Sequence, residues 1–99
     1  MDKYNRVSFI KITDNNNHND FLIDATRMLD ARLRIGALKS QYKIYQKTGK
    51  QYKNVFKYFD LDFSFYVIKK GSYYSYEEVK AERDKLYDLY KSKMENKNI

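Results

Sequence analysis

The segment Val7-Ser-Phe-Ile-Lys-Ile-Thr13 decides the fold, because β-branched and aromatic residues dominate it and such residues favour strands. It is followed by Asp14-Asn-Asn-Asn-His-Asn19, a run of residues that tolerate turn conformations. Apolar residues resume at Phe21-Leu-Ile23. Together the three segments predict a β-hairpin.

A helix is predicted downstream of the hairpin, from Thr26 to the region of Lys47-Thr-Gly49. Its apolar residues recur at spacings of three and four, which places them on one helix face. These residues are Met28, Ala31, Ile35, Leu38, Tyr42 and Tyr45. Gly49 suits the end of the helix, because glycine readily adopts the left-handed conformation of a C-terminal cap.

A short helical turn is expected at residues 54–58, and a third strand after it. Apolar residues alternate there with Asp62, Ser64 and Tyr66, as they do in a strand with one buried face. The residues of that buried face are Leu61, Phe63, Phe65 and Val67. Gly71-Ser72 is expected to end the strand.

Ser75 and Glu78 have the spacing of a capping box, which predicts the start of a final helix. The apolar residues of this helix are Val79, Leu86, Tyr90 and Met94. Residues 91–99 are expected to form a charged, frayed tail. The sequence therefore predicts an α+β fold with the order β-β-α-β-α, in which helices flank a small three-stranded antiparallel sheet.

Length and composition predict a single domain over residues 1–99, with its core at about 7–90, since neither a repeat nor a linker divides the chain. The absence of cysteine excludes a disulfide framework and a thiolate metal site. Apolar runs are far shorter than the roughly 20 residues of a membrane span, and the N-terminus lacks a secretory pattern. We therefore expect no membrane partner and an intracellular location, in the cytoplasm or nucleus of the producing or infected cell.

The charge balance favours a polyanionic partner. Twenty Lys and Arg against thirteen Asp and Glu give a net charge of +7, which attracts nucleic acid over long distances and through counterion release. On the first predicted helix, cations fall on one strip beside the apolar face. The strip consists of Arg32, Gly36, Lys39 and Lys43. With Lys47 and the lysines that follow it up to Lys57, it predicts a DNA-binding or RNA-binding surface.

Several segments resemble the GIY-YIG nuclease domain over residues 7 to 90. Ile10-Lys-Ile-Thr13 is similar to the phrase that begins the family's hairpin, and Phe21-Leu-Ile-Asp-Ala-Thr26 stands in place of its second strand. Phe56-Lys-Tyr-Phe-Asp-Leu-Asp-Phe-Ser-Phe-Tyr-Val-Ile68 looks like the family's helix end, loop and aromatic third strand. Glu77-Glu-Val-Lys-Ala-Glu82-Arg matches the last helix, in which one glutamate binds the metal. Small stand-alone domains of this kind occur in large DNA viruses and phages.

The resemblance implies a nuclease site of which only part is present. The family uses a tyrosine to help activate water, a glutamate-held divalent cation and an arginine near the phosphate. Here Ile10 and Leu22 replace the two tyrosines, and Asp24 replaces the glycine that follows. Arg32 and Glu82 are the matching catalytic positions that remain. Because an aliphatic side chain cannot relay a proton, the chain is expected to bind rather than to cleave.

Glu82 lies on or beside the apolar stripe of its helix, so its carboxylate must be paired, metal-bound or at the rim. An ion pair with Arg32, simple rim exposure and a retained Mg²⁺ or Mn²⁺ site are the alternatives. Without an active site, no cofactor is expected. Gly36 stands where the family often has histidine, and it weakens the middle of its helix. A close contact between helix and strand would explain this glycine.

Three functions are consistent with these features. The first is a nucleic-acid-binding protein on a catalytically degenerate nuclease fold. The second is a metal-dependent DNA endonuclease whose proton relay has moved to another tyrosine, such as Tyr4 or Tyr42. The third is a viral protein-interaction module that blocks or imitates a nuclease. A homodimer through the aromatic third strand or through residues 73–76 is a further hypothesis, since exposed aromatic residues favour interfaces.

Overall fold

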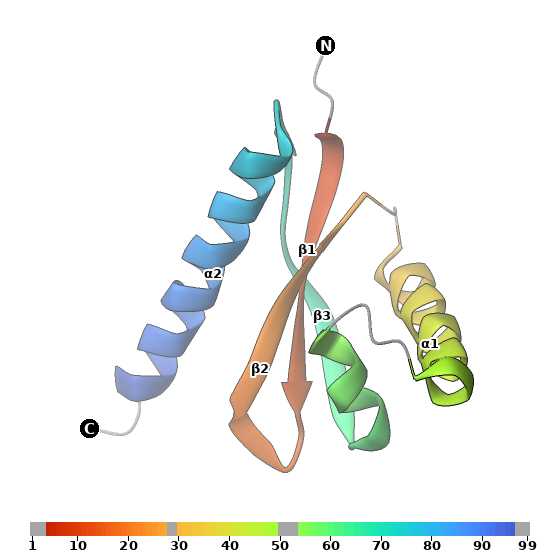
Figure 1. Cartoon of the computed structure of the whole chain (residues 1–99). Helices are drawn as coiled ribbons and strands as arrows, with labels where there is room; N and C mark the ends of the chain where they lie inside the picture. The colour runs from red at the N-terminus through yellow and green to blue at the C-terminus, as the bar shows by residue number, and fades with distance from the viewer. Residues whose placement is uncertain (1–3, 28–29, 50–53, 97–99) are drawn as a thin grey trace.

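The computed structural model describes residues 4–27, 30–49 and 54–96. Its elements are, in order, β1 (Tyr4–Asp14), β2 (Asn17–Thr26), α1 (Ala31–Thr48), the 3-10 helix η1 (Asn54–Asp60), β3 (Phe63–Tyr73) and α2 (Tyr76–Asn96). The three strands form an antiparallel sheet of order β2-β1-β3, so the first strand is central. The predicted α+β fold and its element order are confirmed (Figure 1).

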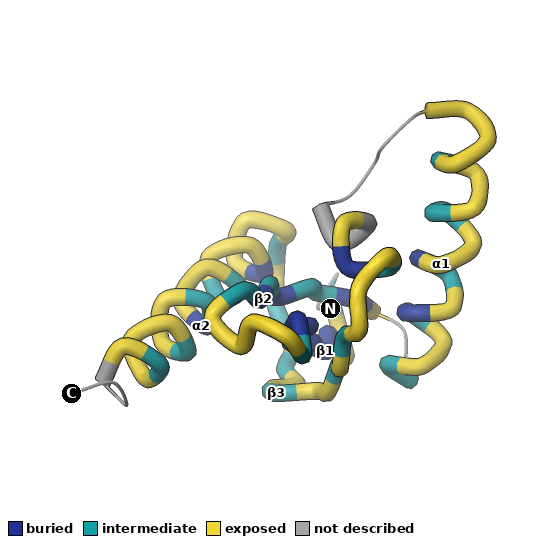
Figure 2. The backbone as a smooth tube through the Cα atoms, turned by 90° about the horizontal axis from the view of Figure 1, so that it is seen from below, coloured by how far each residue is buried: buried dark blue, intermediate teal, exposed yellow. Residues whose placement is uncertain are grey.

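Each face of the sheet carries its own apolar core. The core under α1 and η1 consists of Ile10, Ile12, Ile35, Leu38 and Tyr58. The core under α2 consists of Val7, Phe9, Phe21, Ile23, Val79 and Leu86. Successive side chains of β1 point to opposite faces, which is why one strand supplies both cores. The sheet therefore lies between α1 with η1 on one side and α2 on the other (Figures 1 and 2).

Helix α1 begins at Ala31 rather than at Thr26, because Thr26 pairs with Ser8 at the end of β2. The Asp30 side chain caps the helix by accepting a hydrogen bond from the backbone N–H of Arg32 at 2.8 Å. At the other end, Gly49 adopts φ 75°, which confirms the predicted cap. Met28, expected on the apolar face, lies outside the described residues.

The structure does not require a glycine at position 36. A Cβ atom built on it would meet no atom within 4 Å. The expected close contact between helix and strand is therefore wrong at this position, because the glycine is on the exposed side of α1.

Strand β3 continues to Tyr73, so the prediction that Gly71-Ser72 ends it is wrong. Gly71 pairs with Val7 of β1, and the Ser72 hydroxyl donates to Asn5 Oδ1 at 2.9 Å. Two residues expected on the buried face, Leu61 and Val67, are 42% and 37% exposed. Leu61 precedes the strand, and β3 is a sheet edge with a neighbour on one side only.

Helix α2 opens with part of the predicted capping box, since the backbone N–H of Glu78 donates to Ser75 Oγ at 3.3 Å. The helix continues to Asn96, so the prediction of a frayed tail is wrong for residues 91–96, and residues 97–99 lie outside the described residues. Tyr90 and Met94 pack against the core of this side and hold the last turns in place. In the described part of the chain, no helix is both long and apolar enough to cross a membrane.

Candidate nucleic-acid interface

The two positions compared with the nuclease tyrosines lie in the core below α1. Ile10 is fully buried, and Leu22 packs against the same cluster. Beside them, the guanidinium of Arg34 binds Asp24 with two hydrogen bonds, Nε to Oδ2 at 2.8 Å and Nη2 to Oδ1 at 3.2 Å. Apolar packing and this ion pair occupy the place that the resemblance assigns to a proton relay.

Arg32 and Glu82 form no ion pair with each other, so that alternative is wrong. The Arg32 side chain is 83% exposed and binds Asp30 at 3.0 Å. The Glu82 side chain is 15% exposed and is bound by the ammonium group of Lys69 on β3. The hydrogen bond to Glu82 raises the pKa of Lys69, which keeps the ammonium group protonated. The two catalytic candidates are apart because their helices pack on opposite faces of the sheet.

Glu82 is paired with a lysine rather than grouped with other acidic side chains. Within residues 4–27, 30–49 and 54–96, no three His, Cys, Asp or Glu side chains are grouped so that they could hold a metal ion. Mg²⁺ requires several oxygen ligands in near-ideal geometry. The carboxylate of Glu82 is instead compensated by a lysine.

Three tyrosines on the two sides of the sheet are engaged in other contacts. The Tyr42 hydroxyl on α1 donates to Asp60, and Tyr4 packs against the core on the α2 side. Burial raises the pKa of Tyr73, and the negative charge of Glu82 raises it further. A proton relay through a displaced tyrosine stays a prediction.

The strip predicted along α1 is exposed at Arg32, Lys39, Lys43 and Lys47. The charge of Arg32 is compensated by Asp30, whose hydrogen bond raises the pKa of that arginine. Lys39 Nζ lies 5.7 Å from the centre of the Phe63 ring. None of the three lysines forms an ion pair with a residue of the described ranges. Contact of this strip with nucleic acid stays a prediction.

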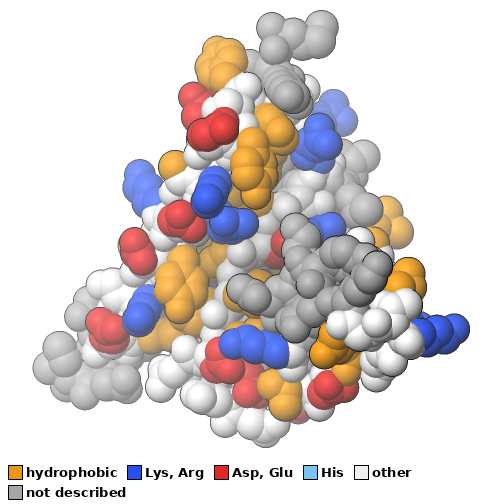
Figure 3. Space-filling view, viewed as in Figure 1, with side chains coloured by type: hydrophobic (Ala, Val, Ile, Leu, Met, Phe, Trp, Pro, Cys, Tyr) orange, Lys and Arg blue, Asp and Glu red, His pale blue; other side chains and the backbone are white. Residues whose placement is uncertain are grey.

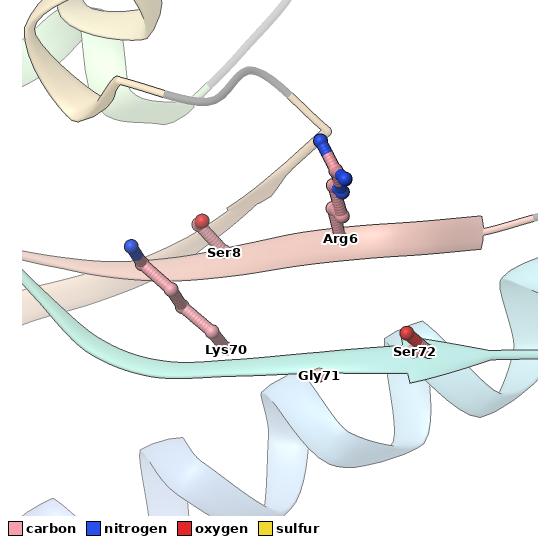
Figure 4. Close-up of a pocket in the computed structure, with 5 residues that line it drawn as sticks. All are labelled: Arg6, Ser8, Lys70, Gly71 and Ser72. Carbon is pink, nitrogen blue, oxygen red and sulfur yellow. The ribbon is translucent and has the colours of Figure 1, made fainter.

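A second basic surface lies at the end of the sheet that α1 leaves open, and the sequence did not reveal it. Ser8 of β1 pairs with Thr26 on one side and with Lys70 on the other. An open cavity of about 430 Å³ there is lined by Arg6, Ser8, Lys70, Gly71 and Ser72. In Figure 4 the side chains of Arg6, Ser8 and Lys70 rise from the side of the sheet opposite α2.

Arg6 is held in an uncommon backbone conformation. Its φ of 63° lies in the left-handed region, which residues other than glycine rarely occupy. The pairing of β1 with β3 also shifts register between Tyr4 and Val7, around this arginine. Such irregularities redirect side chains, and strained residues gather at functional sites. The local distortion therefore marks Arg6 as a candidate binding residue.

Arg27 extends this surface across the end of β2. It lines an adjoining cavity with Ala25, Thr26 and Arg34. Its guanidinium lies 5.2 Å from the centre of the Tyr4 ring, a cation–π contact that brings no negative charge to it. Arg6, Arg27 and Lys70 form no ion pair with any described residue. We call these three residues the sheet-end cluster.

Comparison of the chain with protein-family models, with curated proteins and with solved structures gives no match. A function for this α+β protein therefore rests on its own residues and their geometry.

Proposed function

We propose that this chain is a nucleic-acid-binding protein on a GIY-YIG-like fold that lacks a working nuclease site. The sheet-end cluster holds the sugar–phosphate backbone. The observation that carries the proposal is the collection of three cations from three separate segments, Arg6, Arg27 and Lys70, beside two open cavities. None of them forms an ion pair within the described residues.

The chemistry of this surface suits phosphate groups. Arginine, lysine and serine side chains are the usual donors to phosphate oxygens. Ser8 and Ser72 line the same cavity as Arg6 and Lys70, so hydroxyl and cationic donors are available together. The net charge of +7 adds long-range attraction to this local set of donors.

The strip on α1 has a secondary role in this proposal. Lys39, Lys43 and Lys47 are exposed along one helix and line none of the cavities described here. A strip of this kind neutralises phosphates but does not orient them. We expect it to strengthen binding at low salt and to add little geometric selectivity.

The test compares two triple variants with the same loss of charge. One changes Arg6, Arg27 and Lys70 to Gln, and its matched control changes Lys39, Lys43 and Lys47 to Gln. Affinity for a fluorescein-labelled oligonucleotide is measured by anisotropy over a series of salt concentrations. In the sheet-end variant the slope of log affinity against log salt should become less steep by about 2 for a single strand. The control should change the slope less.

Equal loss in both variants would assign binding to net charge rather than to the sheet-end cluster. Wild-type affinity that does not depend on salt would contradict nucleic-acid binding altogether. Nuclease activity is assessed separately on supercoiled plasmid with Mg²⁺ or Mn²⁺, with Glu82→Ala as the comparison. We expect no nicking by either protein, and nicking that disappears in the variant would contradict the proposed loss of catalysis.

A further inference from the structure

A separate cavity of about 300 Å³ lies at the same end of the sheet but toward α2. It is enclosed by the end of β2, the start of β1 and the first turns of α2. Two tyrosines and three cations stand around it: Tyr4, Tyr76, Arg27, Lys80 and Arg83. The proposed function uses Arg27 of this cavity but none of its other residues.

The aromatic part of the cavity offers a surface for a flat ring. The centres of the Tyr4 and Tyr76 rings are 6.3 Å apart, with 49° between their planes. Tyr76 is 51% exposed, although it is a large aromatic residue. Below them, the buried side chains of Val7 and Val79 make the floor apolar. Exposed aromatic rings of this kind stack on nucleic-acid bases irrespective of sequence.

The charged part of the cavity is positive. Lys80 forms no ion pair within the described residues, and Arg83 Nε is 3.8 Å from Asp84 Oδ1, a long contact between partly exposed groups. Among the described residues, Asp24 supplies the one carboxylate that lines the cavity, and Arg34 compensates it. Figure 3 shows hydrophobic side chains beside the upper part of α2, with Asp and Glu side chains on one side of them and Lys and Arg side chains on the other. An anionic group is therefore favoured next to the two tyrosines.

We propose that this cavity binds one unpaired nucleotide of a nucleic-acid strand, with its base against Tyr76 and Tyr4 and its phosphate near Arg27, Lys80 and Arg83. The inference rests on the proposed function and makes it more specific, because it selects single-stranded over duplex nucleic acid. Bases of a duplex are stacked on their neighbours and are not free to enter the cavity. Arg27 lines this cavity and also belongs to the sheet-end cluster, so one strand can contact both surfaces.

The decisive variant is Tyr76→Leu, which keeps an apolar side chain but removes the ring. Its matched control is Tyr74→Leu, the same change at a tyrosine that is 73% exposed and does not line the cavity. Anisotropy is measured with a short labelled oligothymidylate and with a duplex of the same length. Tyr76→Leu should weaken binding of the single strand about tenfold, since stacking on one ring contributes that much. Tyr74→Leu should bind as the wild type does, and duplex binding should change little in both variants.

Several outcomes would overturn the inference. Equal losses in the two leucine variants would show that the cavity is not the stacking site. Equal affinity of the wild-type protein for the duplex and the single strand would contradict the proposed selectivity. Adenosine monophosphate is the third probe, and if it binds as tightly as the oligonucleotide, the cavity takes free nucleotides instead of a strand.

Failure here can be told from failure of the proposed function. If salt-dependent binding persists while both leucine variants match the wild type, only the stacking site is wrong. If the wild type binds no oligonucleotide at any salt concentration, both proposals are wrong. Circular dichroism of each variant shows whether a loss of binding reflects a loss of fold.

Discussion

Along the central strand β1, Ile10 and Ile12 lie under α1 and η1 and are fully buried, whereas Arg6 and Ser8 line an open cavity at the other end. The covered half carries apolar residues that hold the fold together. The open half carries a strained arginine next to hydroxyl groups. On the face toward α1, one strand therefore carries both a closed apolar core and an open surface lined by a cation, because the helix covers only part of that face.

The covered half should control stability most strongly. Ile12→Ala removes a fully buried side chain from the core under α1. We expect the free energy of unfolding to fall by about 3 kcal/mol, from lost apolar burial and the cavity left behind. Urea denaturation measures this change, with Arg6→Gln in the open half as the control. Comparable losses in the two variants would contradict the division between the halves.

The boundary between the halves is marked by the ion pair of Arg34 and Asp24, whose side chains are 15% and 12% exposed. Asp24→Asn leaves the guanidinium largely buried without its counter-charge, which should cost about 2 kcal/mol of stability. The exposed pair of Arg32 with Asp30 supplies the control, since Arg32→Gln should cost less than about 0.5 kcal/mol. Thermal melts of both variants measure the difference. If Arg32→Gln is the more harmful change, burial does not decide the strength of these pairs.

The helix that covers the apolar half can be strengthened at Gly36. Because a Cβ atom there meets open space, Gly36→Ala should raise the free energy of unfolding by up to about 1 kcal/mol. Gly49→Ala is the opposite case, since φ 75° disfavours a side chain and the change should destabilise. Denaturant midpoints distinguish the two results. Stabilisation by both changes would show that the αL cap does not matter to α1.

The smallest effect concerns Asp20, which accepts a hydrogen bond from the buried Tyr58 hydroxyl at 2.8 Å. That hydrogen bond, with a weaker contribution from Lys57, lowers the pKa of Asp20. A carboxyl whose pKa is lower in the folded state stabilises the fold above its unfolded pKa. We therefore expect a loss of less than about 0.5 kcal/mol as the pH falls below about 4, because the group is partly exposed.

The variant Asp20→Asn tests this pH dependence, since the amide still accepts a hydrogen bond but does not titrate. Denaturation at a series of acidic pH values should show a shallower loss of stability in the variant than in the wild type. Tyr58 does not add to this dependence at acidic pH, because burial and then Asp20 raise the pKa of its phenol. Identical pH profiles for the two proteins would show that this hydrogen bond does not make stability depend on pH.

Much of the fold could be predicted because the signals are local. The spacing of Ile35 and Leu38 predicted the buried side of α1, and Val79 and Leu86 did the same for α2. Gly49 and the pair of Ser75 with Glu78 act through neighbours within a few residues. The predictions failed at the strand after Asp60 and at residues 91–96. The exposure of that strand depends on its position at the sheet edge, and the length of α2 depends on the packing of Tyr90 and Met94. A local sequence pattern shows neither of these causes.

The sequence by itself determined the elements, their order and the side of each helix that is apolar, because side-chain period and capping depend on neighbouring residues. The tertiary structure alone decided which face of the sheet each helix covers, and so it separated Arg32 from Glu82. It also decided strand register, which brings Lys70 and Thr26 to either side of Ser8. Register and helix placement follow from packing between distant segments, which is why the sheet-end cluster emerged only from the folded chain.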